Sequence, residues 1–136
     1  MGPPITTRML LDTARVEARG QTPIGGVRFV ELAEGQRAEA SIDPGAGACV
    51  TVLAHAGLGV REVDLFLRDP ADGHILAQDG ERGPAAIVGG RRGCVRAAAG
   101  GPVSVAVLAR EGRGAVVVGV FAGPTAIGPD AAPVAP

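Results

Sequence analysis

Apolar and polar residues alternate along most of the chain after residue 25, which is the pattern of short β-strands with one buried face. Gly, Pro or Asp residues separate nearly every pair of these segments. Short strands at this spacing are typical of an all-β fold, an antiparallel β-sandwich or a jelly roll. The expected strands are residues 27–32, 36–42, 49–54, 62–68, 74–78, 85–88, 94–97, 103–109 and 115–121.

The segment 63–79 predicts one β-hairpin with a defined turn. An aspartate opens the reversal, a proline presets φ at the first turn position, and a glycine adopts the left-handed conformation that closes a four-residue loop. These turn residues are Asp69, Pro70, Asp72 and Gly73. Alternation along the hairpin places Val63, Leu65, Leu67 and Leu76 in the core, with Leu67 facing Leu76.

The predicted register of this hairpin brings two carboxylates together. With residues 70–73 as the loop, Asp64 lies directly opposite Asp79. Opposed like charges cost a few tenths to about 1 kcal/mol unless something neutralises them. The repulsion can be relieved by a nearby arginine such as Arg61 or Arg82, or by exposure of the carboxylates to water. A calcium ion bound by Asp64 and Asp79 is the alternative, because calcium prefers oxygen ligands.

The two ends of the chain lack this alternation. Within the N-terminal segment, residues 9–18 are expected to form two helical turns whose apolar side carries Leu10, Leu11, Ala14 and Ala18. The C-terminal end is rich in Pro and Ala, as linkers and docked arms are. The expected organisation is an N-terminal segment or arm at 1–24, a β-sandwich domain at 25–122 and a tail at 123–136.

Two late strands have apolar residues on both faces. In residues 103–109, alternate residues line the interior while Ala106 and Leu108 point outward, and residues 115–121 are apolar throughout. A central strand covered on both sides explains this pattern, and a self-association surface is the alternative. The chain has no Lys to protect a strand edge. A homo-oligomer is therefore expected, with residues 1–24 and 122–136 as its arms.

Composition excludes several classes of activity. All thirteen basic residues are Arg, so the chain lacks the lysine of a phosphate-binding loop, a Schiff base or a Ser-Lys dyad. Neither Ser41 nor Ser104 lies in a nucleophile elbow, and a Cys49–His55 pair has no evident orienting partner. We expect the protein not to be an enzyme. Apart from the calcium alternative, we expect no cofactor.

Charge and hydropathy limit the partners. The formal net charge is −1 and the arginines are scattered, so no basic surface for nucleic acid is expected. No apolar stretch approaches the roughly 20 residues of a membrane span. The first ten residues lack the features of a signal peptide, so the chain either stays inside the cell or its leader is absent from this sequence. The bias toward Ala, Gly, Pro and Arg is typical of high-GC bacterial genomes.

The hairpin and the closing strands together resemble the bacterial pre-peptidase C-terminal (PPC) domain. The hallmark of that family, an Asp-Leu-aromatic-Leu strand, is matched by Asp64, Leu65, Phe66 and Leu67. Residues 110–121 resemble its closing strand pair, and the resemblance covers about Val27 to Ala122. It implies an antiparallel β-sandwich of an exported bacterial protein, acting in binding or structure. The sequence departs from such proteins in having no catalytic domain and no Tyr or Trp for a sugar or collagen ligand.

The two cysteines each lie near the start of a strand-like run. From the residues alone, Cys49 and Cys94 form either a disulfide or two small buried thiols. The chain is similar to PPC-like domains of exported proteins that pair an early Cys with a later one. The resemblance therefore implies a Cys49–Cys94 disulfide and a secreted, periplasmic or cell-surface location.

Overall fold

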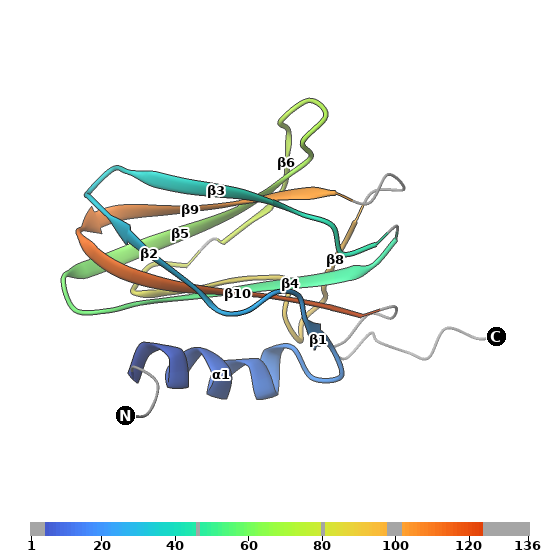
Figure 1. The fold of residues 1–136 in the computed structure, drawn as a ribbon, viewed down its shortest axis with the longest axis horizontal. Coiled ribbons are helices and arrows are strands. Elements are labelled where there is room, and N and C mark those ends of the chain that lie inside the picture. The colour runs from blue at the N-terminus through green and yellow to red at the C-terminus, as the bar shows by residue number, and fades with distance from the viewer. Residues whose placement is uncertain (1–4, 46, 80, 98–101, 124–136) are drawn as a thin grey trace.

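The computed structural model describes residues 5–45, 47–79, 81–97 and 102–123. Two antiparallel sheets pack face to face, and the helix α1 (Ile5–Glu17) lies against the outer side of one of them (Figure 1). This arrangement confirms the predicted antiparallel β-sandwich. The predicted tail falls almost entirely on residues 124–136, outside the described residues.

The larger sheet has the strand order β1-β10-β4-β7, with β2 also pairing with β10 and β8 with β4. Its strands are β1 (Thr22–Pro23), β2 (Arg28–Leu32), β4 (Cys49–Ala56), β7 (Ala85–Val88), β8 (Val95–Arg96) and β10 (Gly114–Gly123). The smaller sheet has the order β3-β9-β5-β6. Its strands are β3 (Arg37–Ile42), β5 (Val60–Arg68), β6 (Ile75–Gln78) and β9 (Val103–Gly112). Each predicted strand is present, and the short β1 is an addition.

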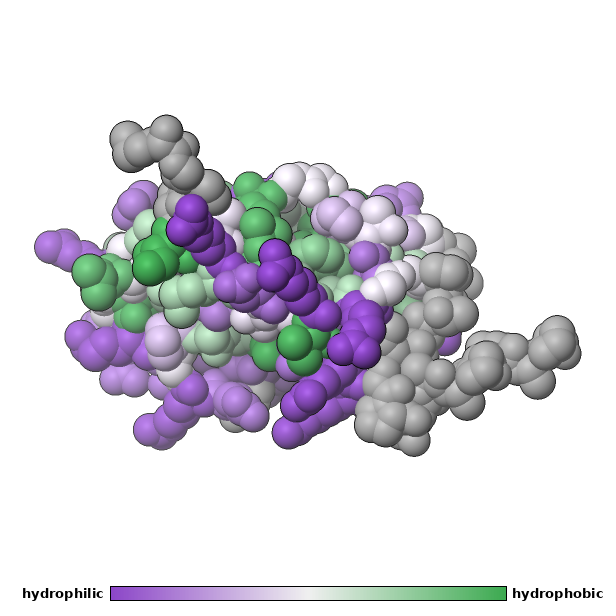
Figure 2. Space-filling model, turned by 90° about the horizontal axis from the view of Figure 1, so that it is seen from below, coloured by the Kyte–Doolittle hydropathy of each residue, from purple (hydrophilic) through white to green (hydrophobic). Residues whose placement is uncertain are grey.

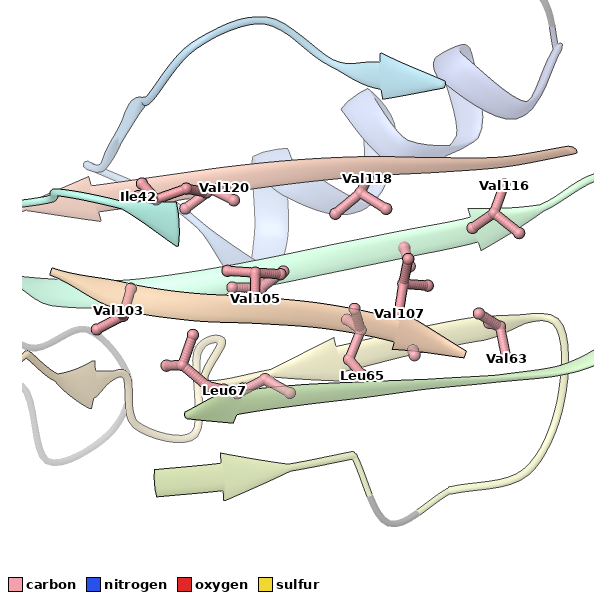
Figure 3. Packing of buried hydrophobic residues seen from close by; sticks show 14 of the residues in the cluster. Ile42, Val63, Leu65, Leu67, Val103, Val105, Val107, Val116, Val118 and Val120 are labelled. Atoms are coloured by element: carbon pink, nitrogen blue, oxygen red, sulfur yellow. The ribbon is translucent and has the colours of Figure 1, made fainter. Parts of the chain in front are cut away.

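The main core fills the space between the two sheets (Figure 3). Val63, Leu65 and Leu67 of β5 are fully buried there, as the alternation predicts, and Leu76 packs against the cluster. Alternate valines of β9 and β10 face one another across the gap (Figure 3). Because the core is almost purely aliphatic, its stability depends on close packing of many small side chains.

Helix α1 covers the outer face of the larger sheet and forms a second, smaller core. Leu10 and Ala18 pack there against Leu53, Val117 and Phe121. The apolar residues on both faces of β10 are thus explained by a strand covered on both sides. The prediction for Leu11 was wrong, because the helix turns Leu10 to the sheet and leaves Leu11 43% exposed.

The outward residues of β9 lie on the uncovered face of the smaller sheet. Ala106 is nevertheless fully buried and Leu108 is half-buried. The small methyl group of Ala106 is shielded by the larger side chains of the neighbouring strands, among them its partner Phe66 in β5. No helix is positioned over this face among the described residues (Figure 1).

The predicted register of the β5–β6 hairpin is correct next to the turn and wrong farther from it. Arg68 pairs with Ile75 as predicted, but Leu67 pairs with Ala77, and a β-bulge leaves Leu76 without a partner. The remaining pairs are therefore shifted by one residue. The predicted pairing of Asp64 with Asp79 is wrong: the Asp79 amide donates to the Leu65 carbonyl at 3.0 Å.

Candidate functional site

An apolar groove opens between β2 of the larger sheet and β3 of the smaller one. It has a volume of about 220 Å³. Its walls are formed by Ile24, Val30, Val118 and Val120 on one side and by Ala38, Ala40, Ile42, Val105 and Val107 on the other. An apolar cavity of about 150 Å³ already accommodates a molecule such as benzene. The groove is therefore large enough to accept aliphatic or aromatic side chains of a ligand.

The groove exists because the inward positions of β3 carry small side chains that do not fill the space between the two sheets. Ala38 and Ala40 are the inward residues opposite Val107 and Val105 of β9, and both alanines are only half-buried. Facing residues Val30 and Ile24 are also half-buried, so the inner faces of the two sheets do not close over one another here. The core thus opens to solvent along this side of the sandwich.

The rim of the groove contains one cation that is available to a ligand. Arg28 lines the groove, is exposed, and forms no ion pair with any residue that the structure describes. Glu39, on the β3 side, accepts a hydrogen bond from the Ser104 hydroxyl at 2.7 Å and lies 3.9 Å from Arg68. The site therefore offers an apolar floor with an unneutralised guanidinium at one edge.

The amino-acid sequence alone does not predict this groove. Alternation predicted a strand at residues 36–42, but it could not show that Ala38 and Ala40 would lie beside an opening between the two sheets. The available signal was the pair of alanines at inward positions of an end strand, where larger β-branched residues are common.

The two carboxylates of the predicted calcium alternative have separate partners. Asp64 is 7% exposed, and its carboxylate accepts a hydrogen bond from Nε of Arg110. This arginine is neither of the two that the sequence suggested. The Asp79 carboxylate accepts from the Ile87 amide at 3.3 Å, and its second oxygen is buried without a partner among the described residues. Burial, with a smaller effect of the Asp64 charge, raises the pKa of Asp79.

The turn residues are arranged around two side-chain hydrogen bonds to the backbone. The Asp69 carboxylate accepts from the Ala71 amide at 2.8 Å, and the Asp72 carboxylate accepts from the His74 amide at 3.0 Å. Gly73 has a φ of 77°, and its amide donates to the Asp69 carbonyl at 2.7 Å. The backbone hydrogen bond from His74 lowers the pKa of the Asp72 carboxyl, and His74 Nδ1, 2.6 Å from Oδ1 of Asp72, lowers it further. Turn geometry accounts for all of these contacts.

Cys49 and Cys94 form a disulfide with a Cα–Cα distance of 5.3 Å. In this form Cys49 offers no thiolate nucleophile. His55 is buried beneath α1, with its Nε2 atom 3.0 Å from the Thr13 hydroxyl. The structure thus gives His55 a contact with the helix and leaves the considered Cys49–His55 pair without a free thiol.

The described helix is too short to cross a membrane. No family model matches the chain, and no curated protein has a detectably similar sequence. Solved structures do have a similar fold. One is the pre-peptidase C-terminal domain of collagenase from Bacillus anthracis, with 13% identity, a TM-score of 0.57, and coverage of 71% of this chain and 89% of that one.

A second similar structure is PliG from Aeromonas hydrophila, a periplasmic inhibitor of g-type lysozyme. It has 13% identity and a TM-score of 0.53, and the match covers 77% of this chain and 90% of that one. At such low identity these likenesses establish the fold alone. The chain therefore has the fold of a PPC-like β-sandwich domain.

Proposed function

We propose that this protein is a non-catalytic binding module that holds an apolar part of another protein in the groove between β2 and β3. The observation that supports this function is the open aliphatic groove with the exposed Arg28 at its rim. Burying apolar surface there releases roughly 25 cal/mol per Å². Since the groove is lined by carbon atoms and has few polar groups, it suits an apolar segment better than a sugar or a nucleotide.

An apolar dye with an anionic group tests this proposal, because it matches both the groove and Arg28. We expect anilinonaphthalene sulfonate to bind the folded protein saturably with one site per chain. The variant Ala40→Leu fills the groove from the β3 side and should lose this binding, and Arg28→Glu should weaken it. Gln78→Leu places the same leucine side chain at the exposed far edge of the same sheet and serves as the control for added apolar surface.

Each variant is first checked by far-UV circular dichroism and thermal unfolding. A folded Ala40→Leu protein that binds the dye as the unchanged chain does would contradict the groove as the binding site. Loss of binding in Gln78→Leu as well would show that the dye reports a general change of the fold.

We further infer that the module acts outside the cytoplasm. Disulfides persist in oxidising compartments and are rare in cytosolic proteins of mesophiles. The described part of the chain contains the Cys49–Cys94 disulfide, and one protein with a similar fold is periplasmic. Thiol labelling of the protein, recovered from the cytoplasm and from the periplasm of an expression host, checks this inference. Complete labelling in both compartments would contradict it.

Self-assembly is a second candidate, favoured by exposed apolar side chains on α1. Ile5, Met9 and Val16 are 74%, 47% and 44% exposed. On the molecular side where α1 lies, apolar residues are interspersed with hydrophilic ones (Figure 2). Sedimentation velocity at rising concentration tests this candidate. A monomer at high micromolar concentration would exclude it and leave the groove as the site of partner binding.

A further inference from the structure

The outer edge of β3 lies beside the groove and is not paired. β3 ends the smaller sheet and, among the described strands, pairs only with β9. At its beginning, the carbonyl of Gln36 accepts from the Ala109 amide, so the backbone groups of even-numbered residues point toward β9. In an antiparallel ladder the alternate residues point their backbone groups the other way. Arg37, Glu39 and Ser41 therefore direct their N–H and C=O groups to the free edge.

These backbone groups have no partner in the part of the chain that the structure describes. None of the hydrogen bonds from loops or side chains ends on the backbone of Arg37, Glu39 or Ser41. The side chains at the same positions point away from the core, whereas Ala38 and Ala40 form the groove wall. A free strand edge and an apolar groove thus lie side by side on β3.

The larger sheet provides the second half of this arrangement. Ile24 and Val30 lie on its β2 side, line the groove and are half-buried, so part of their apolar surface stays open to solvent beside the edge of β3. A further strand placed beside β3 in the smaller sheet would direct every second side chain toward these residues. The same strand would satisfy the free backbone groups of β3.

We propose that the partner is an extended peptide segment that adds to the smaller sheet as a fifth strand along β3. This inference rests on the proposed function of the groove and names the class of its partner. The segment inserts alternate apolar side chains between the sheets and pairs its backbone with the edge at Arg37, Glu39 and Ser41. An acidic side chain among the inserted ones neutralises Arg28, which lines the groove without an ion pair in the described residues.

The probe is a synthetic peptide of about eight residues that alternates valine and threonine, with one central valine replaced by glutamate. We expect it to bind the full chain with one site, as measured by isothermal titration calorimetry. A version with lysine in place of glutamate should bind more weakly, since Arg28 would repel it. A version N-methylated at the alternate amides that face β3 cannot donate hydrogen bonds to this strand. It should bind about tenfold more weakly.

A variant of the chain tests the strand edge without altering the groove wall. Ser41→Pro removes an outward N–H from an end strand, where proline is tolerated because no ladder bond is lost. It should weaken peptide binding about tenfold and leave dye binding unchanged. Ser41→Ala retains the N–H and is the matched control, which should bind both probes normally.

The outcomes separate the two proposals. If Ser41→Pro and the N-methylated peptide both retain full binding, while Ala40→Leu loses it, strand addition is overturned and the groove function stands. If Ala40→Leu keeps full binding of both the peptide and the dye, the groove function itself is overturned. If the unmodified peptide does not bind although the dye does, the partner is not an extended strand. If the circular dichroism spectrum of Ser41→Pro differs from that of the unchanged chain, the variant is misfolded, and the N-methylated peptide alone tests strand addition.

Discussion

The hydroxyl oxygen of Thr13 in α1 lies 3.0 Å from Nε2 of His55 in β4, and this contact joins the helix to the larger sheet. The hydroxyl donates its own hydrogen to the Met9 carbonyl, so its oxygen accepts from the Nε2–H group. His55 is only 8% exposed, and burial lowers its pKa from the ordinary value. Nε2–H can donate to Thr13 in either protonation state, so it is burial, and not this hydrogen bond, that favours the neutral imidazole.

A dependence of stability on pH follows from the burial of His55. Because the pKa of His55 is lower in the folded than in the unfolded chain, its contribution is fully present above about pH 6.5 and is lost as the pH falls through the folded value. We expect the melting temperature of the unchanged chain to fall relative to His55→Gln between pH 7 and pH 5. Carboxylates titrate in both proteins, so the difference isolates His55. A constant difference across this range would contradict the assignment.

The helix also depends on a glycine in the sheet beneath it. A Cβ atom at Gly119 would lie 2.9 Å from Cδ2 of Leu10, which is fully buried. We expect Gly119→Ala to destabilise the fold by about 1–3 kcal/mol through overpacking. Leu10→Ala should cost about 2–5 kcal/mol through loss of buried apolar contacts. The double variant should lose less than the sum, because the new methyl group occupies part of the vacated space. Strict additivity in urea unfolding would contradict a direct contact.

Reduction of the disulfide should lower stability substantially. Cys49 and Cys94 are 45 residues apart, and closing a loop of this size restricts the unfolded chain by on the order of 4 kcal/mol. Guanidinium unfolding with and without reductant measures the loss. The double variant Cys49→Ala with Cys94→Ala should match the reduced chain and be insensitive to reductant. Two reactive thiols in the unfolded, unreduced protein would show that the bridge does not form.

The Asp79 carboxylate is expected to destabilise the fold at neutral pH, because one of its charged oxygens is buried without a partner among the described residues. Its pKa is raised in the fold, so the folded state disfavours the charged form and stability is lost as the pH rises through the folded value. We expect Asp79→Asn to raise the melting temperature at pH 7 and to have no such effect below the ordinary pKa of an aspartate, about 3.9. Scanning calorimetry at the two pH values provides the comparison.

The same variant tests the calcium alternative. Because Arg110 already binds Asp64, we expect equal melting temperatures in millimolar calcium and in chelator. A ligand bound only by the folded state would add about 2.7 kcal/mol at a hundredfold excess over its Kd. A clear calcium-dependent rise that Asp79→Asn abolishes would establish a metal site and contradict the expected stabilisation by this substitution.

Alternation along the sequence was sufficient to predict the strands and the β-sandwich, because burial of one strand face imposes a period of two on neighbouring residues. The turn of the β5–β6 hairpin was equally predictable, since Pro70 and Gly73 restrict or extend the accessible backbone angles locally. The resemblance to PPC domains added the Cys49–Cys94 pairing, which the residues alone left open. Each of these features depends on short-range chemistry or on a recognisable pattern.

The tertiary structure determined which side chains from different strands contact one another. The bulge at Leu76 moves Asp79 away from the position opposite Asp64, and Arg110 from a different strand neutralises Asp64 instead. The sequence could not reveal this, because the register beyond a turn depends on strands that are distant along the chain. The groove has the same origin: the space beside Ala40 is open because β3 ends its sheet and no further described strand lies along it. Local patterns determine which face of a strand is buried, but the packing of the sheets determines what lies opposite it.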